Sequence, residues 1–242
     1  MSGSVGIARA MVLAAGLGTR MRPITLSTPK PLVEVGGKAL IDWGLDALAD
    51  AGVALAVVNV HHLADQMEQH LQSRRRPEIV ISDERGKLLD SAGGVVKALP
   101  ILGDGPFLIL NADTFWIDGA QDSLSRLLQA WDDASMDILL LLADPQNATG
   151  HSGSTDFLRD AEGRLSRAKG SPEGLIYAGA GIFHPRIFAG AEAKPHSLNL
   201  YFDRAISEGR LYGEHMDAHW ITVGTPDAIA SADAAVEAAR AR

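Results

Sequence analysis

The chain has 242 residues, 46% of them hydrophobic and 21% charged, which is typical of a globular protein with a sizeable core. Its net charge of −8 excludes the broad positive charge of nucleic-acid-binding proteins, and the absence of cysteine excludes disulfides and thiolate metal sites. No run approaches the roughly 20 apolar residues of a membrane span, and no secretory signal stands at the N-terminus, so we expect a cytoplasmic protein that binds neither membranes nor nucleic acid.

Short apolar runs alternate with amphipathic stretches over the first 143 residues. Helices are predicted at residues 39–51, 63–73, 92–99 and 121–132, and the first of them places Leu40, Trp43, Ala47 and Leu48 on one face. Strands are predicted at residues 8–15, 54–60, 78–82, 106–110 and 136–143. Near-continuous apolar strands that alternate with helices indicate a mostly parallel sheet covered on both faces and wound by right-handed crossovers.

The pattern changes from about residue 144. The predicted elements there are a hairpin at 156–169, strands at 175–183, 211–214 and 220–223, and helices at 198–207 and 227–241. No internal repeat is found, and in particular no hexapeptide β-helix repeat. We therefore predict one domain over residues 1–242 without a β-helix domain. Its fold class is α/β, a Rossmann-like three-layer α/β/α arrangement with a mixed, mostly parallel central sheet.

A glycine loop, GLGTRMRP, directly follows the first predicted strand. Ligands of open α/β sheets bind at the carboxyl ends of strands, where glycines let backbone amides approach an anion such as phosphate. The dinucleotide motif G-x-G-x-x-G fails because Met21 stands at the third glycine, and no G-x-x-x-x-G-K-[ST] loop occurs. Pro23, Pro29 and Pro31 prevent a regular helix, so a stiff loop can hold two arginines and a lysine over one anionic group.

The stretch LAAGLGTRMRPITLSTPKPL resembles the signature of sugar-1-phosphate nucleotidyltransferases, L-A-A-G-x-G-T-R-[ML]-x-P-x-T-x-x-x-P-K-P. Three later segments resemble further parts of that family in the same order, namely LDSAGGVVKAL (89–99), FLILNAD (107–113) and HWITVGTPDAI (219–229). The resemblance implies a GT-A-like nucleotidyltransferase of EC 2.7.7 type, which joins an NTP to a sugar 1-phosphate and releases pyrophosphate. It implies that residues about 8–143 bind the nucleotide and about 144–242 bind the sugar and add the closing helix.

The resemblance also implies the catalytic groups. Arg20 would contact the β- and γ-phosphates, Lys30 would bridge the α-phosphate and the attacking oxygen, and Asp113 would bind Mg²⁺ through oxygen. The attacking phosphate is already ionised, so no general base is required. The nucleotide-binding residues expected in this way are Leu13, Ala14, Ala15, Gly16, Gly18, Thr19, Arg20, Lys30, Glu84, Ala92 and Gly93.

For the sugar phosphate, the resemblance implies contacts from Asn111, Lys169 and Gly179. Lys169 falls where the family often has a lysine, although Ala168 stands in place of the preceding glutamate. Gly179, within YAGAGIF, would bring backbone close to the sugar.

The second metal position departs from the family pattern, because Thr222 stands where W-x-D-x-G-T has aspartate. A hydroxyl is a weak, neutral ligand, and three interpretations follow. In the first, which we favour, Mg²⁺ is bound by Asp113 and by substrate oxygens, because phosphates supply most of the negative charge that the ion needs. Alternatively, Asp217 or Asp227 substitutes, or the protein has lost turnover.

The features NADTF, LDSAGG, GIFHP and GEHMDAHW resemble the short single-domain members that use UTP and an amino-sugar 1-phosphate such as N-acetylmuramate 1-phosphate. Glu84 keeps GTP open, with a mannose- or heptose-type 1-phosphate, because a carboxylate pairs with the two N–H donors of guanine. A non-catalytic nucleotide-sugar sensor on the same fold is the alternative of another class. The sequence indicates no oligomeric state.

Overall fold

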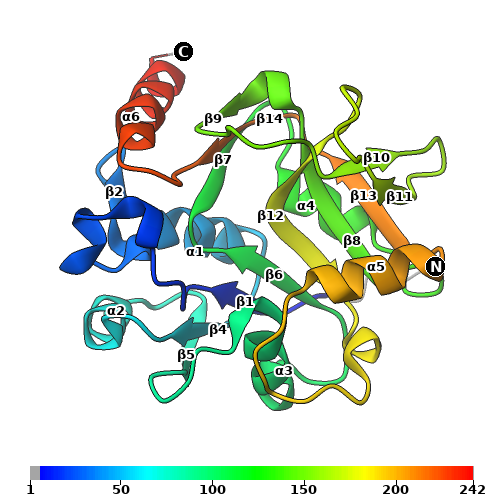
Figure 1. Ribbon diagram of the computed structural model, residues 1–242, viewed down its shortest axis with the longest axis horizontal. Helices are drawn as coiled ribbons and strands as arrows, with labels where there is room; N and C mark the ends of the chain where they lie inside the picture. Colours follow the sequence, from blue (N-terminus) through cyan, green and yellow to red (C-terminus); the bar gives the residue numbers. More distant parts are fainter. Residues whose placement is uncertain (1–5, 242) are drawn as a thin grey trace.

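A seven-stranded sheet, in the order β13-β8-β12-β6-β1-β4-β5, forms the centre of the computed structural model, which describes residues 6–241 (Figure 1). Strands β1, β4, β5 and β6 are parallel, β8 is parallel to β13, and β12 runs antiparallel to both β6 and β8. The strands are β1 (Arg9–Leu13), β4 (Leu55–Val60), β5 (Glu78–Asp83), β6 (Phe107–Asn111), β8 (Ile138–Ala143), β12 (Ile176–Phe183) and β13 (Leu211–His215). The predicted mixed, mostly parallel sheet is confirmed.

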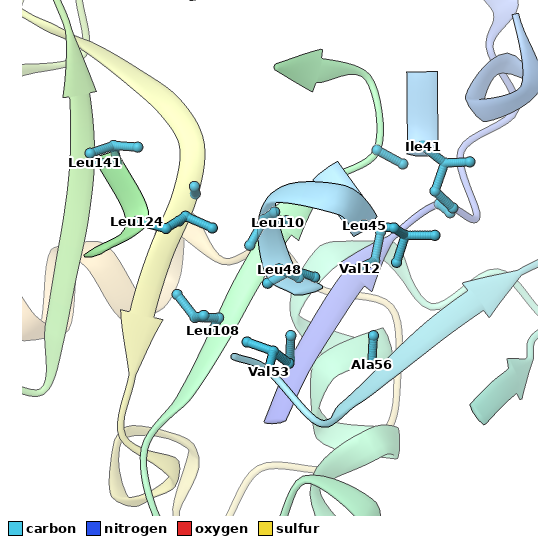
Figure 2. Close-up of a cluster of buried hydrophobic side chains, with 14 of the residues drawn as sticks. Val12, Ile41, Leu45, Leu48, Val53, Ala56, Leu108, Leu110, Leu124 and Leu141 are labelled. Atoms are coloured by element: carbon cyan, nitrogen blue, oxygen red, sulfur yellow. The ribbon is translucent and has the colours of Figure 1, made fainter. Parts of the chain in front are cut away.

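Helices cover both faces of this sheet, so alternate residues of each strand are buried on opposite sides. In β6, Leu108 and Leu110 belong to one core and Phe107 and Ile109 to the other. The first core is covered by α1 (Leu40–Asp50), α2 (Ala64–Leu71) and α4 (Ser123–Ala130), and the second by α3 (Asp90–Leu102) and α5 (Asn199–Ser207). Figure 2 shows Leu45 and Leu48 of α1 beside Val12 of β1 and Leu108 and Leu110 of β6.

The face predicted for α1 is wrong in part. Leu48 is buried and Ala47 partly buried in the core against the central sheet, where Ile41 and Leu45 complete the buried face, whereas Leu40 and Trp43 pack into a different core. Trp43 instead stacks on Phe115, with ring centroids 4.6 Å apart. The helix therefore has two apolar sides, because a second layer of structure packs against it beyond the central sheet.

That second layer is a three-stranded sheet, β7 (Thr114–Asp118), β14 (Ala218–Thr222) and β9 (Ala148–Thr149), covered by α6 (Asp227–Arg240). The strand β7 was not predicted from the sequence. Only Ala112 and Asp113 separate it from β6, so no glycine or proline marks the change of direction. The predicted hairpin forms from β10 (Phe157–Arg159) and β11 (Leu165–Arg167), and a small ribbon from β2 (Glu34–Val35) and β3 (Lys38–Ala39). No helix within residues 6–241 is long and apolar enough to cross a membrane.

Candidate active site

The glycine loop leaves the carboxyl end of β1 and folds into three short 3₁₀ turns, Thr19–Met21, Ile24–Leu26 and Lys30–Leu32. Gly18 has a left-handed backbone, with φ 61°, and its carbonyl accepts a 2.7 Å hydrogen bond from the Thr25 hydroxyl. A Cβ at Gly18 would lie 2.8 Å from Cγ2 of Thr25, so both the conformation and the packing require glycine there. Met21, the residue that breaks the dinucleotide motif, is fully buried and anchors the loop in the core.

The loop delivers Lys30 to the end of β6. Nζ of Lys30 donates a 2.6 Å hydrogen bond to Oδ2 of Asp113, and the two side chains are 11% and 34% exposed. The pair lies at the edge of a cavity of about 340 Å³. Of the predicted site residues, the cavity wall contains Leu13, Ala14, Ala15, Gly16, Lys30, Asn111 and Asp113.

Three further polar residues line this cavity, namely Asn59, which was not predicted from the sequence, and Asp90 and Ser91 at the start of α3. Asn59 is a buried polar residue in the apolar strand VVNV, and that contrast is the signal that could have identified it. Its Oδ1 accepts a 2.7 Å hydrogen bond from the backbone N–H of Ala14, which holds the start of the glycine loop against β4.

Glu84 lies behind the cavity wall and is 2% exposed. Its Oε1 accepts a 2.8 Å hydrogen bond from Nδ2 of Asn59, and its Oε2 accepts one of 2.9 Å from the backbone N–H of Leu89. A Cβ at Gly94 would lie 2.8 Å from both Asn59 and Glu84, so this glycine lets α3 approach the pair closely. Both oxygens of Glu84 are thus bonded within the protein, and they join β5 to β4 and to the start of α3.

Ala92 and Gly93, in the first turns of α3, pack against the segment that precedes α5. The backbone N–H of Ala92 donates a 3.0 Å hydrogen bond to the carbonyl of His196, and a Cβ at Gly93 would collide with the carbonyl of Lys194. Neither residue lines the cavity, whereas their neighbours Asp90 and Ser91 do.

Arg20 and Thr19 are exposed and do not line the cavity. A Cβ at Gly224 would lie 3.7 Å from the guanidinium of Arg20, which places this arginine beside the turn between β14 and α6. Lys30 therefore lines the cavity, whereas Arg20 does not line it and lies beside Gly224.

The structure places Thr222 close to Asp113 through the backbone. Thr222 is paired with Thr114 in the β7–β14 ladder, and the N–H of Val223 donates a 3.2 Å hydrogen bond to the carbonyl of Asp113. Asp217 precedes the opposite end of β14, five residues and roughly 16 Å away along the extended strand. This distance overturns the idea that Asp217 joins Asp113 at one metal ion.

Asp227 is exposed in the first turn of α6, three residues after Gly224. Within residues 6–241, no group of three or more histidine, cysteine, aspartate or glutamate residues could hold a metal ion. Among the residues that line the cavity, Asp113 at the end of β6 and Asp90 at the start of α3 carry carboxylates.

Gly179 and Lys169 occupy different environments. Gly179 has φ +81°, and a Cβ there would lie 2.5 Å from Oγ1 of Thr114 and 3.1 Å from Nδ2 of Asn111. It therefore allows β12 to approach the end of β6. Lys169 is exposed in the turn after β11, with φ +48°, and does not line the cavity.

A second cavity, of about 200 Å³, adjoins the first and shares Leu13, Ser91 and Asn111 with it. Its other walls come from the β10–β11 hairpin and α5, on the right of Figure 1, and from β12 near the centre. Arg167 at the end of β11 lines this cavity and was missed by the sequence analysis. The two cavities therefore share a wall that contains Asn111.

Several known proteins are similar to this chain. Residues 9–239 match the family model described as Nucleotidyl transferase. The chain is 45% identical over 231 residues to the N-acetylmuramate alpha-1-phosphate uridylyltransferase of Caulobacter vibrioides, covering 93% of this chain and 95% of that protein. It is 34% identical over 220 residues to the protein of the same name from Neisseria meningitidis serogroup B, covering 90% and 93%.

Among solved structures, the inositol-1-phosphate CTP transferase from T. maritima superposes with a TM-score of 0.74. The match covers 92% of this chain and 91% of that one at 18% identity, a level that supports the fold alone. It agrees with the Rossmann-like architecture observed here.

Proposed function

The chain belongs to the nucleotidyl transferase family, and from this we propose that it transfers the uridylyl group of UTP to N-acetylmuramate 1-phosphate, releasing pyrophosphate. The observation that carries the proposal is the Lys30–Asp113 pair at the edge of a cavity bounded by the glycine loop. The two relatives described above are both named uridylyltransferases of this sugar phosphate, which favours UTP over GTP.

In the proposed reaction, a phosphate oxygen of the sugar 1-phosphate attacks the α-phosphorus of UTP. A new P–O bond forms, the bond from the α-phosphorus to the bridging oxygen breaks, and pyrophosphate leaves with that electron pair. Both reactants are anions, so the protein must offset their repulsion and align them. Lys30 would contact the α-phosphate and the attacking oxygen, Arg20 the β- and γ-phosphates, and the amides from Gly16 to Thr19 the triphosphate.

A divalent cation fits the residues present. Mg²⁺ binds through one or two carboxylates and substrate phosphates, and Asp113 offers one half-exposed carboxylate at the cavity edge. We propose that Asp113 holds Mg²⁺ together with phosphate oxygens, with Thr222 nearby as a neutral neighbour. When bound, the ion would neutralise charge on the phosphates.

The remaining predicted residues receive supporting roles in this proposal. Glu84 orients Asn59 and the start of α3, so that Ala14, Asp90 and Ser91 form a wall for the base. Ala92 and Gly93 fix the position of α3 against the preceding segment of α5.

The second cavity takes the sugar in this proposal. Asn111 contacts the sugar phosphate from the wall that both cavities share, and Gly179 keeps backbone close to it. Lys169 supplies a further cation for that phosphate from the exposed turn after β11. We also propose that the protein is cytoplasmic, because its proposed substrates are cytoplasmic metabolites.

The test incubates the protein and Mg²⁺ with each of four NTPs and a panel of sugar 1-phosphates, and measures pyrophosphate. We expect release with UTP and N-acetylmuramate 1-phosphate. Release with GTP and mannose 1-phosphate alone would replace the proposed substrates. Tight binding of an NTP without release from any pair would favour the sensor on the same fold.

A further inference from the structure

The wall of the second cavity contains one arginine whose orientation is fixed from several sides. Nε of Arg167 donates a 2.8 Å hydrogen bond to Oδ1 of Asp203, and Nη2 donates one of 2.9 Å to Oδ1 of Asn199. The guanidinium lies over the rings of Phe157 and Phe202, 4.9 and 5.7 Å from their centroids. The strand β11 and the helix α5 thus hold the planar group in place.

This guanidinium retains capacity to bind a ligand. Within residues 6–241, Arg167 makes its hydrogen bonds through Nε and Nη2 and none through Nη1. Its side chain is 28% exposed and lines the cavity, whereas the side chain of Asp203 is 62% exposed and therefore well hydrated. Solvent screens the Arg167–Asp203 pair, so the positive charge is not fully offset toward the cavity.

Two further polar residues, Tyr177 and Asp156, line the same cavity. The hydroxyl of Tyr177 is buried and has no hydrogen-bond partner among the described residues. Asp156 accepts a 2.9 Å hydrogen bond from the backbone N–H of Tyr177 through Oδ2, which leaves Oδ1 for another donor. A buried hydroxyl without a partner is costly, and a ligand that carries hydroxyl and amide groups would satisfy it.

We propose that Arg167 is a specificity-determining residue that binds a carboxylate on the acceptor sugar, so that the enzyme prefers carboxylate-bearing amino-sugar 1-phosphates over neutral ones. This inference rests on the proposed function. N-acetylmuramate differs from N-acetylglucosamine by a lactyl ether that ends in a carboxylate. The fork of a guanidinium matches a carboxylate, and the fixed orientation of Arg167 lowers the entropy cost of that contact.

The other polar groups would contact the parts that the two sugars share. Asp156 and Tyr177 are suited to ring hydroxyls and the acetamido group, and Asn111 lies where the sugar phosphate meets the nucleotide cavity. Loss of Arg167 should therefore affect one sugar and not the other, which separates charge recognition from a general defect.

The experiment compares kcat/KM for N-acetylmuramate 1-phosphate and N-acetylglucosamine 1-phosphate, with UTP saturating, in the native protein and in Arg167→Gln. We expect Arg167→Gln to lower the value for the carboxylate-bearing sugar roughly 10- to 100-fold. The value for the neutral sugar and the KM for UTP should change less than about threefold, since the neutral sugar has no carboxylate for Arg167 and UTP is assigned to the other cavity. Equal losses for both sugars, or no loss for either, would overturn the inference.

Two further variants guard against a simple loss of packing. Arg167→Lys keeps the charge without the fork and should retain part of the preference. Arg164→Gln, at an exposed arginine of the same hairpin that lies over Tyr212, should leave the preference unchanged. A Tm of Arg167→Gln close to that of the native protein would show that the hairpin still packs on α5.

A failure of the proposed function gives a different result, because the native protein would then release no pyrophosphate with either sugar. Calorimetric titration of the native and Arg167→Gln proteins with the two sugar 1-phosphates still decides the inference in that case. Preferential binding of the carboxylate-bearing sugar that the substitution removes supports it, and equal affinities in both proteins reject it.

Discussion

Lys30 and Asp113, 83 residues apart in the sequence, are joined by a hydrogen bond of 2.6 Å between Nζ and Oδ2. The lysine comes from the last turn of the glycine loop and the aspartate from the end of β6. Each holds the other at the edge of the cavity, so the position of the cation depends on both the loop and the sheet.

Replacing Lys30 by alanine should lower kcat by about 100- to 1,000-fold, because the lysine would stabilise charge in the transition state. Removing one such hydrogen-bond donor lowers kcat by this factor in other enzymes. The KM for UTP should change much less. Steady-state pyrophosphate release measures both constants. Lys38→Ala is the matched control, because Lys38 also makes a 2.6 Å pair, with Asp46, on the surface near α1. A native rate in Lys30→Ala would refute its assigned role.

Thr222→Asp should tighten the dependence of the rate on Mg²⁺, because it adds a carboxylate beside Asp113. We expect the Mg²⁺ concentration at half-maximal rate to fall by roughly tenfold, which corresponds to about 1.4 kcal/mol. A Mg²⁺ titration at fixed UTP measures it. Thr225→Asp adds the same charge at an exposed position three residues later and should have little effect. If both variants respond equally, position 222 is not at the metal.

Glu84→Gln should destabilise the fold by about 2 kcal/mol, because the new amide presents N–H donors to Asn59 or Leu89, each already a donor there. The KM for UTP should rise as well, since the wall formed by Asn59 shifts. Urea unfolding and steady-state kinetics measure the two effects. Glu78→Gln, at an exposed position on the same strand, serves as the control. Unchanged stability would show that the two hydrogen bonds contribute nothing.

Gly179→Ala should cost both stability and activity, because the new Cβ would meet Thr114 and Asn111 while the backbone keeps φ +81°. We expect a loss of roughly 3 kcal/mol, the sum of backbone strain and overpacking. Gly52→Ala isolates the strain, since Gly52 has φ +82° and nothing within 4 Å of its Cβ position. Thermal unfolding of both proteins gives the difference, and equal losses would contradict the packing argument.

Asp137→Asn should destabilise the protein by roughly 2 kcal/mol at pH 7. Burial tends to raise the pKa of Asp137, but hydrogen bonds from Arg186 and Arg210 outweigh it and leave the pKa below its usual value. A lowered folded-state pKa contributes stability that is complete above the unfolded value of about 3.9 and is lost as the pH falls through the folded value.

The difference between native and Asp137→Asn proteins should therefore shrink below about pH 4. Urea unfolding at pH 7 and at pH 3 measures this change. Asp104→Asn, at an exposed turn before β6, should show no such dependence. A difference that is constant with pH would mean that the charge of Asp137 does not stabilise the fold.

The alternation of apolar strands and amphipathic helices was sufficient to predict the layered sheet, because burial on both faces leaves a continuous apolar pattern. The strand β7 could not be predicted in this way. It follows β6 after two residues, and its partner strand β14 comes from a distant part of the chain. Trp43 was grouped with Leu48 on one face of α1 for the same reason, since its partner Phe115 lies in β7.

The site was predictable where function depends on a contiguous segment. The glycine loop, Lys30 and Asp113 lie in two segments whose pattern was recognisable, and the structure brings them together. Glu84 was expected beside the nucleobase, but the sequence gives no indication that Asn59 and Leu89 donate hydrogen bonds to both of its carboxylate oxygens. Arg167 was missed because its surroundings come from α5, more than 30 residues later in the chain.

The antiparallel strand β12 lies between β6 and β8, although the chain forms β6 and β8 first. When synthesis has reached residue 143, β6 and β8 are complete, but β12, the strand that lies between them, has not yet been made. Those neighbours present unpaired backbone edges until residue 183 emerges, a delay of several seconds at the usual rates of about 5–20 residues per second. The nascent chain is therefore vulnerable to misassociation during that interval, when chaperones or slow translation would matter most.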